Sequence, residues 1–194
     1  MKKTLILSAA LAALAAAGAV QAQSASYAID GSHTFVTFEI KHFNFGFSTS
    51  RGRFDKKEGS IALDPAAKTG KVEVTIDTAS INTGVAALDK HLKSADFFDA
   101  EKHPSARFEG SQFVFDGAQL KSVSGTLTLL GKTQPVTLNA DQYGCYDHPL
   151  LKVQVCAGDF STTIKRSQWG MEKMLGILPD EVRLVIQVEA VKQP

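Results

Sequence analysis

The stretch VEVTIDTASINTGVAALDKHLKSADFFDAEKHPSARF, from Val72 to Phe108, decides how the rest of the chain is interpreted. Apolar and polar residues alternate at both of its ends, which is typical of β-strands with one buried face. Between these ends, Val85, Leu88 and Leu92 recur at helical spacing. The stretch therefore predicts two strands with a short helix inserted between them.

Phe97 and Phe98 follow the predicted helix at once. Neighbouring side chains of an extended segment point to opposite sides, so these two rings are not expected to enter one layer of a core. One of the two rings then needs an apolar partner outside that layer. We expect the helix to close the mouth of a sheet, with aromatic rings turned toward what lies beneath.

Alternation of apolar and polar residues predicts strands along most of the remaining chain. The expected ranges are 34–41, 50–55, 60–63, 72–76, 106–115, 123–130, 135–142, 158–165 and 182–191. In the motif HFNFGF, residues 42–47, Phe43, Phe45 and Phe47 recur at period two and extend the apolar face of the first strand. About eight strands with short turns and no strand–helix alternation predict a β-sandwich or an up-and-down barrel.

Residues 1–22 have the pattern of a Sec signal peptide. Lys2 and Lys3 precede a short apolar run that ends in Val20-Gln21-Ala22, a small-x-small cleavage signal. A retained membrane anchor is the weaker alternative, because the apolar run is short. We therefore expect a single mature domain, residues 23–194, in the periplasm. Loss of the two lysines leaves 19 basic against 20 acidic residues, and a net charge of −1 disfavours binding to nucleic acid.

The chain has two cysteines, Cys145 and Cys156, eleven residues apart. This spacing suits opposed positions on a β-hairpin, and an exported protein meets conditions that permit disulfides. We predict that the two cysteines form a disulfide. A redox-active pair is the alternative, but such pairs usually have the closer C-x-x-C spacing.

No nucleotide-binding, serine hydrolase or zinc protease motif occurs in the sequence. The nearest grouping is Asp89, His91, Asp96, Asp99 and His103, whose spacing matches no known metal site. One interpretation is a cation site or an acid–base pair formed by Asp89, His91 and His103, acting on a lipid headgroup. The other is a solvated helix surface followed by a turn.

The sequence contains 12 phenylalanines but one tryptophan and three tyrosines, so most of its aromatic area carries no polar group. A core filled by these rings is the plain interpretation, and it would suit a ligandless structural or stress protein. An eight-stranded barrel is also just wide enough to hold one slender ligand. The pattern of the residues leaves both interpretations open.

A series of short motifs runs through the whole mature chain. In order, they are Asp30-Gly31-Ser32-His33, Val36-x-Phe38-x-Ile40-x-His42, Gly52-x-Phe54, Ser80-Ile81-x-Thr83, DKHLKSADF at 89–97, His103-Pro104-x-x-Arg107-Phe108, Gly125-x-Leu127-Thr128-Leu129-x-Gly131, Pro135-Val136 and Arg166-Ser167. Together they resemble the YceI-like family of secreted polyisoprenoid-binding proteins, and the motif at 89–97 is the most specific. Two departures are Leu88, where the family commonly has a basic residue, and the cysteine pair, which looks like a local addition.

The resemblance implies an extended, lipocalin-like antiparallel barrel of eight strands, with a short helix at its mouth and a long apolar tunnel. The tunnel would hold an isoprenoid or similar lipid chain, for example a prenyl quinone. The family brings no catalytic residues, no metal and no obligatory cofactor. We therefore expect a carrier and not an enzyme, with a membrane redox protein as a partner suggested by family analogy alone. The oligomeric state is open, and a dimer is compatible with the sequence.

Because of the resemblance, we expect the apolar residues of the interior to line the tunnel. These residues are Val36, Phe38, Ile40, Phe43, Phe45, Phe47, Val74, Ile76, Leu92, Phe97, Phe98, Phe108, Leu127, Leu129, Trp169, Met171, Met174 and Leu175. The candidate contacts to a headgroup are His33, His42, His91 and Arg166. Because a long chain needs an opening to leave, the helix and the segment 171–178 are candidate lids.

Overall fold

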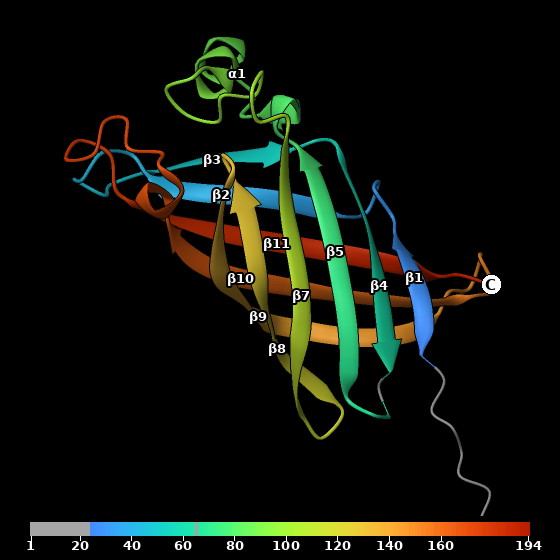
Figure 1. The fold of residues 1–194 in the computed structure, drawn as a ribbon. Coiled ribbons are helices and arrows are strands. Elements are labelled where there is room, and N and C mark those ends of the chain that lie inside the picture. The colour runs from blue at the N-terminus through green and yellow to red at the C-terminus, as the bar shows by residue number, and fades with distance from the viewer. Residues whose placement is uncertain (1–23, 65) are drawn as a thin grey trace, which may run out of the picture.

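The computed structural model describes residues 24–64 and 66–194, so the signal peptide predicted for residues 1–22 lies outside the described residues. Almost all of this part of the chain is β-structure (Figure 1). The strands are β1 (Ala25–Ile29), β2 (Phe35–Lys41), β3 (Thr49–Phe54), β4 (Lys57–Asp64), β5 (Thr69–Asp77), β6 (Ile81–Asn82), β7 (Ser105–Asp116), β8 (Gln119–Leu129), β9 (Lys132–Asp147), β10 (Gln154–Lys165) and β11 (Glu181–Lys192).

Eight of these strands close into an antiparallel barrel. They follow one another in the order β1, β4, β5, β7, β8, β9, β10 and β11, and pairing between β1 and β11 completes the ring. The long strands curve around this ring with bulges that leave one residue unpaired at Ser111 in β7, at Lys121 in β8 and at Asp141 in β9. Such bulges increase twist locally and allow a sheet to close on itself. The structure thus has the barrel that the resemblance implied.

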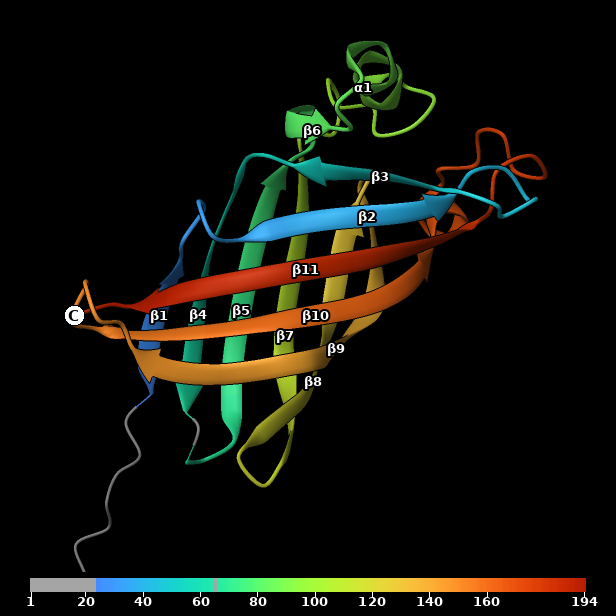
Figure 2. The same cartoon turned by 180° about the vertical axis from the view of Figure 1, so that it is seen from behind.

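The wall of the barrel is lengthened at one end by β2, β3 and β6. One edge of β11 pairs with β1 through residues 190–192 and with β2 through residues 183–187, so the two strands lie end to end along it (Figure 2). β3 then pairs with β2, and β6 pairs with β3. The barrel is therefore elongated, with β1 near one end and the hairpin of β2 and β3 near the other (Figure 1).

The helix α1 (Ala86–Lys93) lies above β3 and β6, outside the barrel wall (Figure 1). Asp89 fixes the helix, because its Oδ1 accepts hydrogen bonds from the backbone N–H of Thr83 at 2.7 Å and from the Thr83 hydroxyl at 2.6 Å. These bonds hold the pKa of the Asp89 carboxyl below its ordinary value. The predicted short helix between two strands is confirmed. No helix in the described part of the chain has the length and apolar character needed to cross a membrane.

Two local predictions about phenylalanines are wrong. Residues 42–48 form the loop that reverses the chain between β2 and β3, so Phe43, Phe45 and Phe47 do not continue a strand. Phe43 has a φ of 53° and Gly46 a φ of 71°, values that a strand does not permit. Phe97 lies in a tight turn, with its backbone N–H bonded to the carbonyl of Ser94 at 3.0 Å. The rule for extended segments therefore does not apply to Phe97 and its neighbour.

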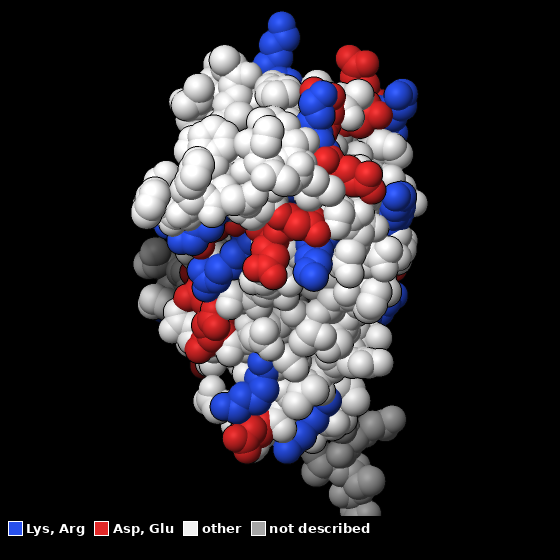
Figure 3. Space-filling model, turned by 90° about the vertical axis from the view of Figure 1, so that its left-hand side faces the viewer, with Lys and Arg blue, Asp and Glu red and all other residues white. Residues whose placement is uncertain are grey.

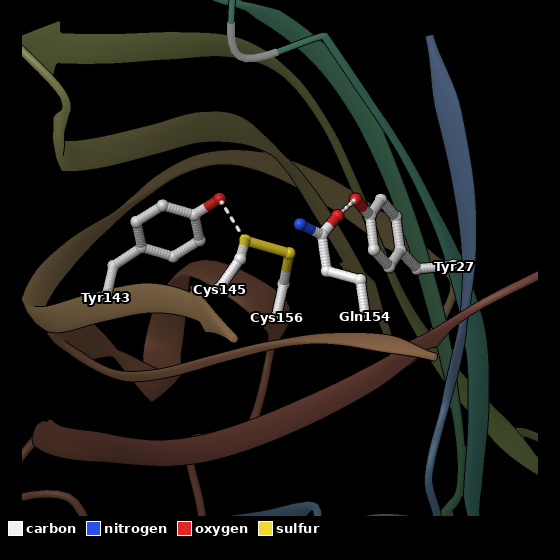
Figure 4. The surroundings of a disulfide bond; sticks show 5 residues. All are labelled: Tyr27, Tyr143, Cys145, Gln154 and Cys156. Carbon is white, nitrogen blue, oxygen red and sulfur yellow. Dashed lines mark hydrogen bonds between the residues drawn. A yellow bond between two sulfur atoms is a disulfide. The ribbon is translucent and has the colours of Figure 1, made fainter. Parts of the chain in front are cut away.

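The predicted disulfide is confirmed. Cys145 in β9 and Cys156 in β10 are directly opposed, and their sulfur atoms are 2.03 Å apart (Figure 4). The bond closes the hairpin near the end of the barrel where β1 lies. A disulfide in this position indicates that the protein folds in an oxidising compartment.

Candidate functional site

The interior of the barrel contains a chamber at the β1 end, which we call the inner chamber. The volume of this cavity is about 130 Å³. The residues that line it come from strands all around the ring: Tyr27, Ile29, Val36, Ile61, Leu63, Val72, Val74, Ile76, Phe108, Phe113, Leu120, Val123, Leu127, Val136, Leu138, Tyr143, Cys156, Ala157, Phe160, Leu184, Ile186 and Val188. Alternating positions of each strand thus point apolar side chains into one space.

The few polar atoms of the inner chamber are already bonded (Figure 4). The Tyr27 hydroxyl donates to Oε1 of Gln154 at 2.7 Å, and the Tyr143 hydroxyl lies 3.2 Å from Sγ of Cys145. Burial raises the pKa of both tyrosines above its ordinary value, so both hydroxyls are neutral. The inner chamber consequently offers apolar contacts and no charge.

A second space, the outer chamber, lies at the end where β2, β3 and α1 meet. The volume of this cavity is about 360 Å³. Its lining comes from the β2–β3 hairpin, from α1 and the turn after it, and from the segment between β10 and β11. Phe38, Phe54 and Phe98 form one wall, with ring centroids 5.4 to 6.4 Å apart.

The two chambers adjoin each other inside the barrel. Four residues line both of them, namely Val36, Ile76, Leu127 and Leu184, and we call this ring the waist. Inward-facing rings therefore do not fill the axis of the barrel. The alternative of a ligandless protein with a filled core is contradicted by this space.

The outer chamber differs from the inner one because polar side chains reach it. They are Lys41, His42, Ser50, Arg51, Thr83, His91 and Arg166. Some are engaged elsewhere: Nε of Arg51 donates to Oε1 of Glu39 at 2.7 Å. His91 Nε2 lies 3.4 Å from Oδ2 of Asp96, and its ring meets that of Phe97 edge-on at 5.0 Å. The polar end of a ligand would find its partners here.

Arg166 is the most deeply buried charge of the outer chamber, with 3% of its surface exposed. Its Nε donates to the carbonyl of Pro179 at 3.0 Å, and its Nη1 donates to the carbonyls of Met171 and Lys173 at 2.7 and 2.8 Å. Within the described residues, Nη2 has no hydrogen-bond partner. Burial lowers the pKa of this guanidinium, and the carboxylate of Asp180 opposes that effect. The two N–H groups of Nη2 on this buried cation are thus left without a protein partner.

Most of the residues predicted to line the tunnel do so. In the outer chamber lie Val36, Phe38, Ile40, Phe43, Ile76, Leu92, Phe97, Phe98, Leu127, Leu129, Met171 and Met174, while Val74 and Phe108 line the inner chamber. Of the candidate headgroup contacts, His42, His91 and Arg166 border the outer chamber. Phe97 and Phe98 reach it together, because the turn after α1 directs both rings the same way.

Four apolar residues predicted as lining lie elsewhere. Phe45 and Phe47 are 77% and 95% exposed, and Leu175 is also exposed, because all three lie on loops outside the barrel. Trp169 is 1% exposed and packs in the wall, where its Nε1 donates to the carbonyl of Leu127 at 3.0 Å. These side chains have the right chemistry for a lining, but the backbone turns them away from the tunnel.

The predicted headgroup contact His33 also lies outside the tunnel. Its ring is exposed, and Nδ1 lies 2.8 Å from Oδ2 of Asp30. Hydrogen bonding and the charge of Asp30 raise the pKa of His33 above its ordinary value, while the pKa of Asp30 is lowered. The pair stabilises the turn between β1 and β2.

The grouping of Asp89, His91 and His103 does not form one site. Asp89 is bonded to Thr83, and His91 faces Asp96. The backbone carbonyl of His103 accepts a hydrogen bond from the hydroxyl of Thr78 at 2.6 Å, away from the other two side chains. Among the described residues, no three His, Cys, Asp or Glu side chains are placed to hold a metal ion.

The sequence interpretation missed more than half of the lining. The missed residues of the inner chamber lie on β1, β4 and β5 and on strands β7 to β11, for example Tyr27, Leu63, Phe113, Tyr143 and Phe160. Their signal was present, because each occupies an inward position of an alternating strand. β1 itself was missed, because its sequence ASYAI alternates only weakly between apolar and polar residues.

Comparison with known proteins agrees with this geometry. The sequence pattern of the YceI-like domain matches residues 27–190. The chain belongs to the YceI-like family. A UPF0312 protein of Pseudomonas aeruginosa (strain LESB58) is 41% identical over 199 residues and covers 100% of both chains. A UPF0312 protein of Azotobacter vinelandii is 39% identical over 197 residues, also with 100% of both chains covered.

Solved structures of the YceI-like family share the barrel. Burkholderia cenocepacia BcnA is 28% identical, with a TM-score of 0.67, over 83% of this chain and 98% of that chain. A Campylobacter jejuni YceI protein is 29% identical, with a TM-score of 0.67, over 76% of this chain and 88% of that one. A domain of Saccharophagus degradans described as polyisoprenoid binding has a TM-score of 0.64 over 87% and 99% of the two chains, and at 16% identity it supports the fold alone. The resemblance and the fold expected from it are confirmed.

Proposed function

We propose that this protein is a periplasmic carrier that holds one isoprenoid or similarly long lipid chain in its tunnel and catalyses no reaction on it. The observation that carries the proposal is the pair of apolar chambers that adjoin at the waist inside the barrel. A slender space with an apolar lining and a polar entrance suits a ligand with a long hydrocarbon tail and a small polar head. The name of the Saccharophagus degradans domain, which mentions polyisoprenoid binding, is consistent with this class of ligand.

The tail would occupy the inner chamber and the waist. Each CH₂ group transferred from water gains about 0.8 kcal/mol, so a five-carbon isoprene unit gains about 4 kcal/mol before ordering costs. Val74 and Phe108 in the inner chamber and Phe38 and Phe98 in the outer one are the side chains we propose to contact the tail. Affinity would therefore accrue along the tail and not at the head.

The headgroup would lie in the outer chamber beside Arg166. Arg166 lines this chamber and its Nη2 has no partner within the described residues. A guanidinium can donate to a quinone carbonyl or, more strongly, to a phosphate oxygen. His42 and His91, at the border of the same chamber, are proposed as further contacts. Because Arg166 also holds the segment between β10 and β11, ligand binding and the position of that segment would be linked.

The periplasm is the compartment that we propose, in accord with the disulfide between Cys145 and Cys156. Free isoprenoid chains partition into membranes, so a carrier is needed wherever they must cross water. A membrane redox protein is a reasonable partner for a carrier of prenyl quinones, and this suggestion rests on family analogy.

The direct test is to purify the protein from the periplasm, measure its mass in native conditions, and extract and identify any bound lipid. The Phe38→Asp variant places a charge in the apolar wall and should bind no chain, since burying an unpaired carboxylate is strongly unfavourable. The His91→Ala variant should keep most of the binding. Wild-type protein that carries no lipid, and takes up no octaprenyl benzoquinone on titration, would rule the proposal out.

A further inference from the structure

Two loops meet at the end of the barrel where the outer chamber opens. One comprises residues 42–48, between β2 and β3, and the other residues 171–178, before β11 (Figure 1). They are joined by Asn44, whose backbone N–H donates to the carbonyl of Ile177 at 3.1 Å and whose Nδ2 donates to the carbonyl of Gly176 at 2.7 Å. We call this pair the rim loops.

The rim loops are apolar on both of their sides. Phe43, Met174 and Leu178 face inward and line the outer chamber. Phe45, Phe47, Leu175 and Ile177 face solvent, and Phe47 is the most exposed of them at 95%. Apolar side chains therefore lie both on the outside of the rim loops and on their chamber side. Exposure of several large apolar side chains together marks an interaction site.

The tips of the rim loops carry no charged residue. The sequences HFNFGFSTS at 42–50 and MLGILP at 174–179 contain no Lys, Arg, Asp or Glu. Figure 3, which faces this end of the molecule, shows a broad uncharged area beside a band of mixed basic and acidic side chains. A partner that attracts the loops must therefore be apolar at the point of contact.

We propose that the rim loops dock on the surface of a lipid bilayer, with Phe45, Phe47, Leu175 and Ile177 inserted among the headgroups and upper acyl chains. Short apolar elements that enter the interface in this way hold peripheral proteins at membranes. Docking turns the tunnel mouth toward the bilayer, so a lipid chain moves between membrane and tunnel without crossing water. The inference rests on the proposed carrier function. It adds that the bilayer is the donor and the acceptor of the lipid chain.

A second copy of the protein fits these loops less well. Stable protein interfaces bury on the order of 1,200–2,000 Å² in total, which requires a broad complementary surface. The four outward side chains instead sit on two short projecting loops, and a fluid bilayer accommodates such tips without a matching shape. Because the charge near the tips is mixed, docking should depend little on the fraction of anionic lipid.

The test uses the full mature protein and the Phe47→Asp/Ile177→Asp double variant, with vesicles of phosphatidylcholine that contain octaprenyl benzoquinone. The matched control is Leu150→Asp/Leu151→Asp, which changes exposed leucines on the hairpin loop between β9 and β10, at the opposite end of the barrel. We expect the rim variant to float with vesicles about tenfold less and to take up quinone from them about tenfold more slowly. Its uptake of quinone from detergent micelles, and all properties of the control variant, should match the wild type.

The outcomes test membrane docking and the carrier function separately. A rim variant that takes up quinone from vesicles at the wild-type rate overturns the docking proposal and leaves the carrier function intact. Wild-type protein that takes up quinone from neither vesicles nor micelles overturns the carrier function, and docking with it. If sedimentation shows a wild-type dimer that the rim variant abolishes, while neither protein floats with vesicles, the loops form an interface between two copies and docking is overturned.

Discussion

Replacement of Val36 by tryptophan should close the tunnel at its waist. Val36 lies on β2, is 8% exposed, and is one of the four residues that line both chambers. Its neighbours across the sheet are Phe54 in β3 and Ile186 in β11, so an indole at this position has no room in the wall and must enter the tunnel. The outer chamber then remains, but a tail cannot pass into the inner chamber.

The size of the effect follows from the tail length beyond the waist. Each isoprene unit that enters the inner chamber gains about 4 kcal/mol, and ordering it costs about 1.5 kcal/mol, which leaves a net gain of about 2.5 kcal/mol. This corresponds to an affinity increase of about 60-fold for each unit. In the wild type the increase should continue until the inner chamber is full. In the Val36→Trp variant it should stop as soon as the outer chamber is full.

Calorimetric titration with a series of prenyl benzoquinones of increasing tail length measures this difference. The matched control is Val114→Trp, because Val114 is exposed on the outer face of β7 and lines neither chamber. Overpacking costs about 1–3 kcal/mol of stability, so a thermal melt must first show that the waist variant is folded. A folded Val36→Trp protein whose affinity rises with tail length as in the wild type would show that the tail does not pass the waist.

Three further outcomes are expected. Arg166→Met should bind a plain polyprenyl chain as the wild type does but lose its preference for a quinone-bearing chain, which competition between the two ligands measures. Serine at both Cys145 and Cys156, which are 11 residues apart, should lower the free energy of unfolding by about 2.8 kcal/mol in the loop-entropy model, as a urea titration would show. Asp30 raises the pKa of His33. Protonated His33 therefore contributes stability that is complete below its unfolded-state pKa of about 6.5 and is lost as pH rises through the higher folded-state pKa. Asp30→Asn should bring that pKa, followed by NMR, back toward its ordinary value.

Alternation of apolar and polar residues was enough to place most of the sheet. Each predicted strand overlaps a strand of the structure. An antiparallel barrel buries one face of every strand, so every second residue of the strand must be apolar. The same rule misled at Phe43, Phe45 and Phe47. Period two marks positions on one side of an extended chain, but it does not show that the chain stays extended, and here Gly46 takes part in a reversal.

Whether the interior is hollow could not be obtained from the pattern of residues. A filled core and a lined tunnel require the same inward apolar side chains, such as Phe38 and Phe108, and differ only in the distance between opposite walls. The resemblance to a family supplied the expectation, and the structure provided the chambers. The role of Arg166 was likewise only partly visible, since its three bonds to backbone carbonyls depend on a loop that no periodicity describes.

The barrel closes only when its first strand pairs with its last. β1 joins β11 through Tyr27, Ala28 and Ile29, which meet residues 190–192 at the far end of the polypeptide. A growing polypeptide lacks that terminal segment, and contacts between such distant positions are slow to form. The barrel is therefore closed last, and a product cut short before residue 190 would lack the pairing that completes the ring.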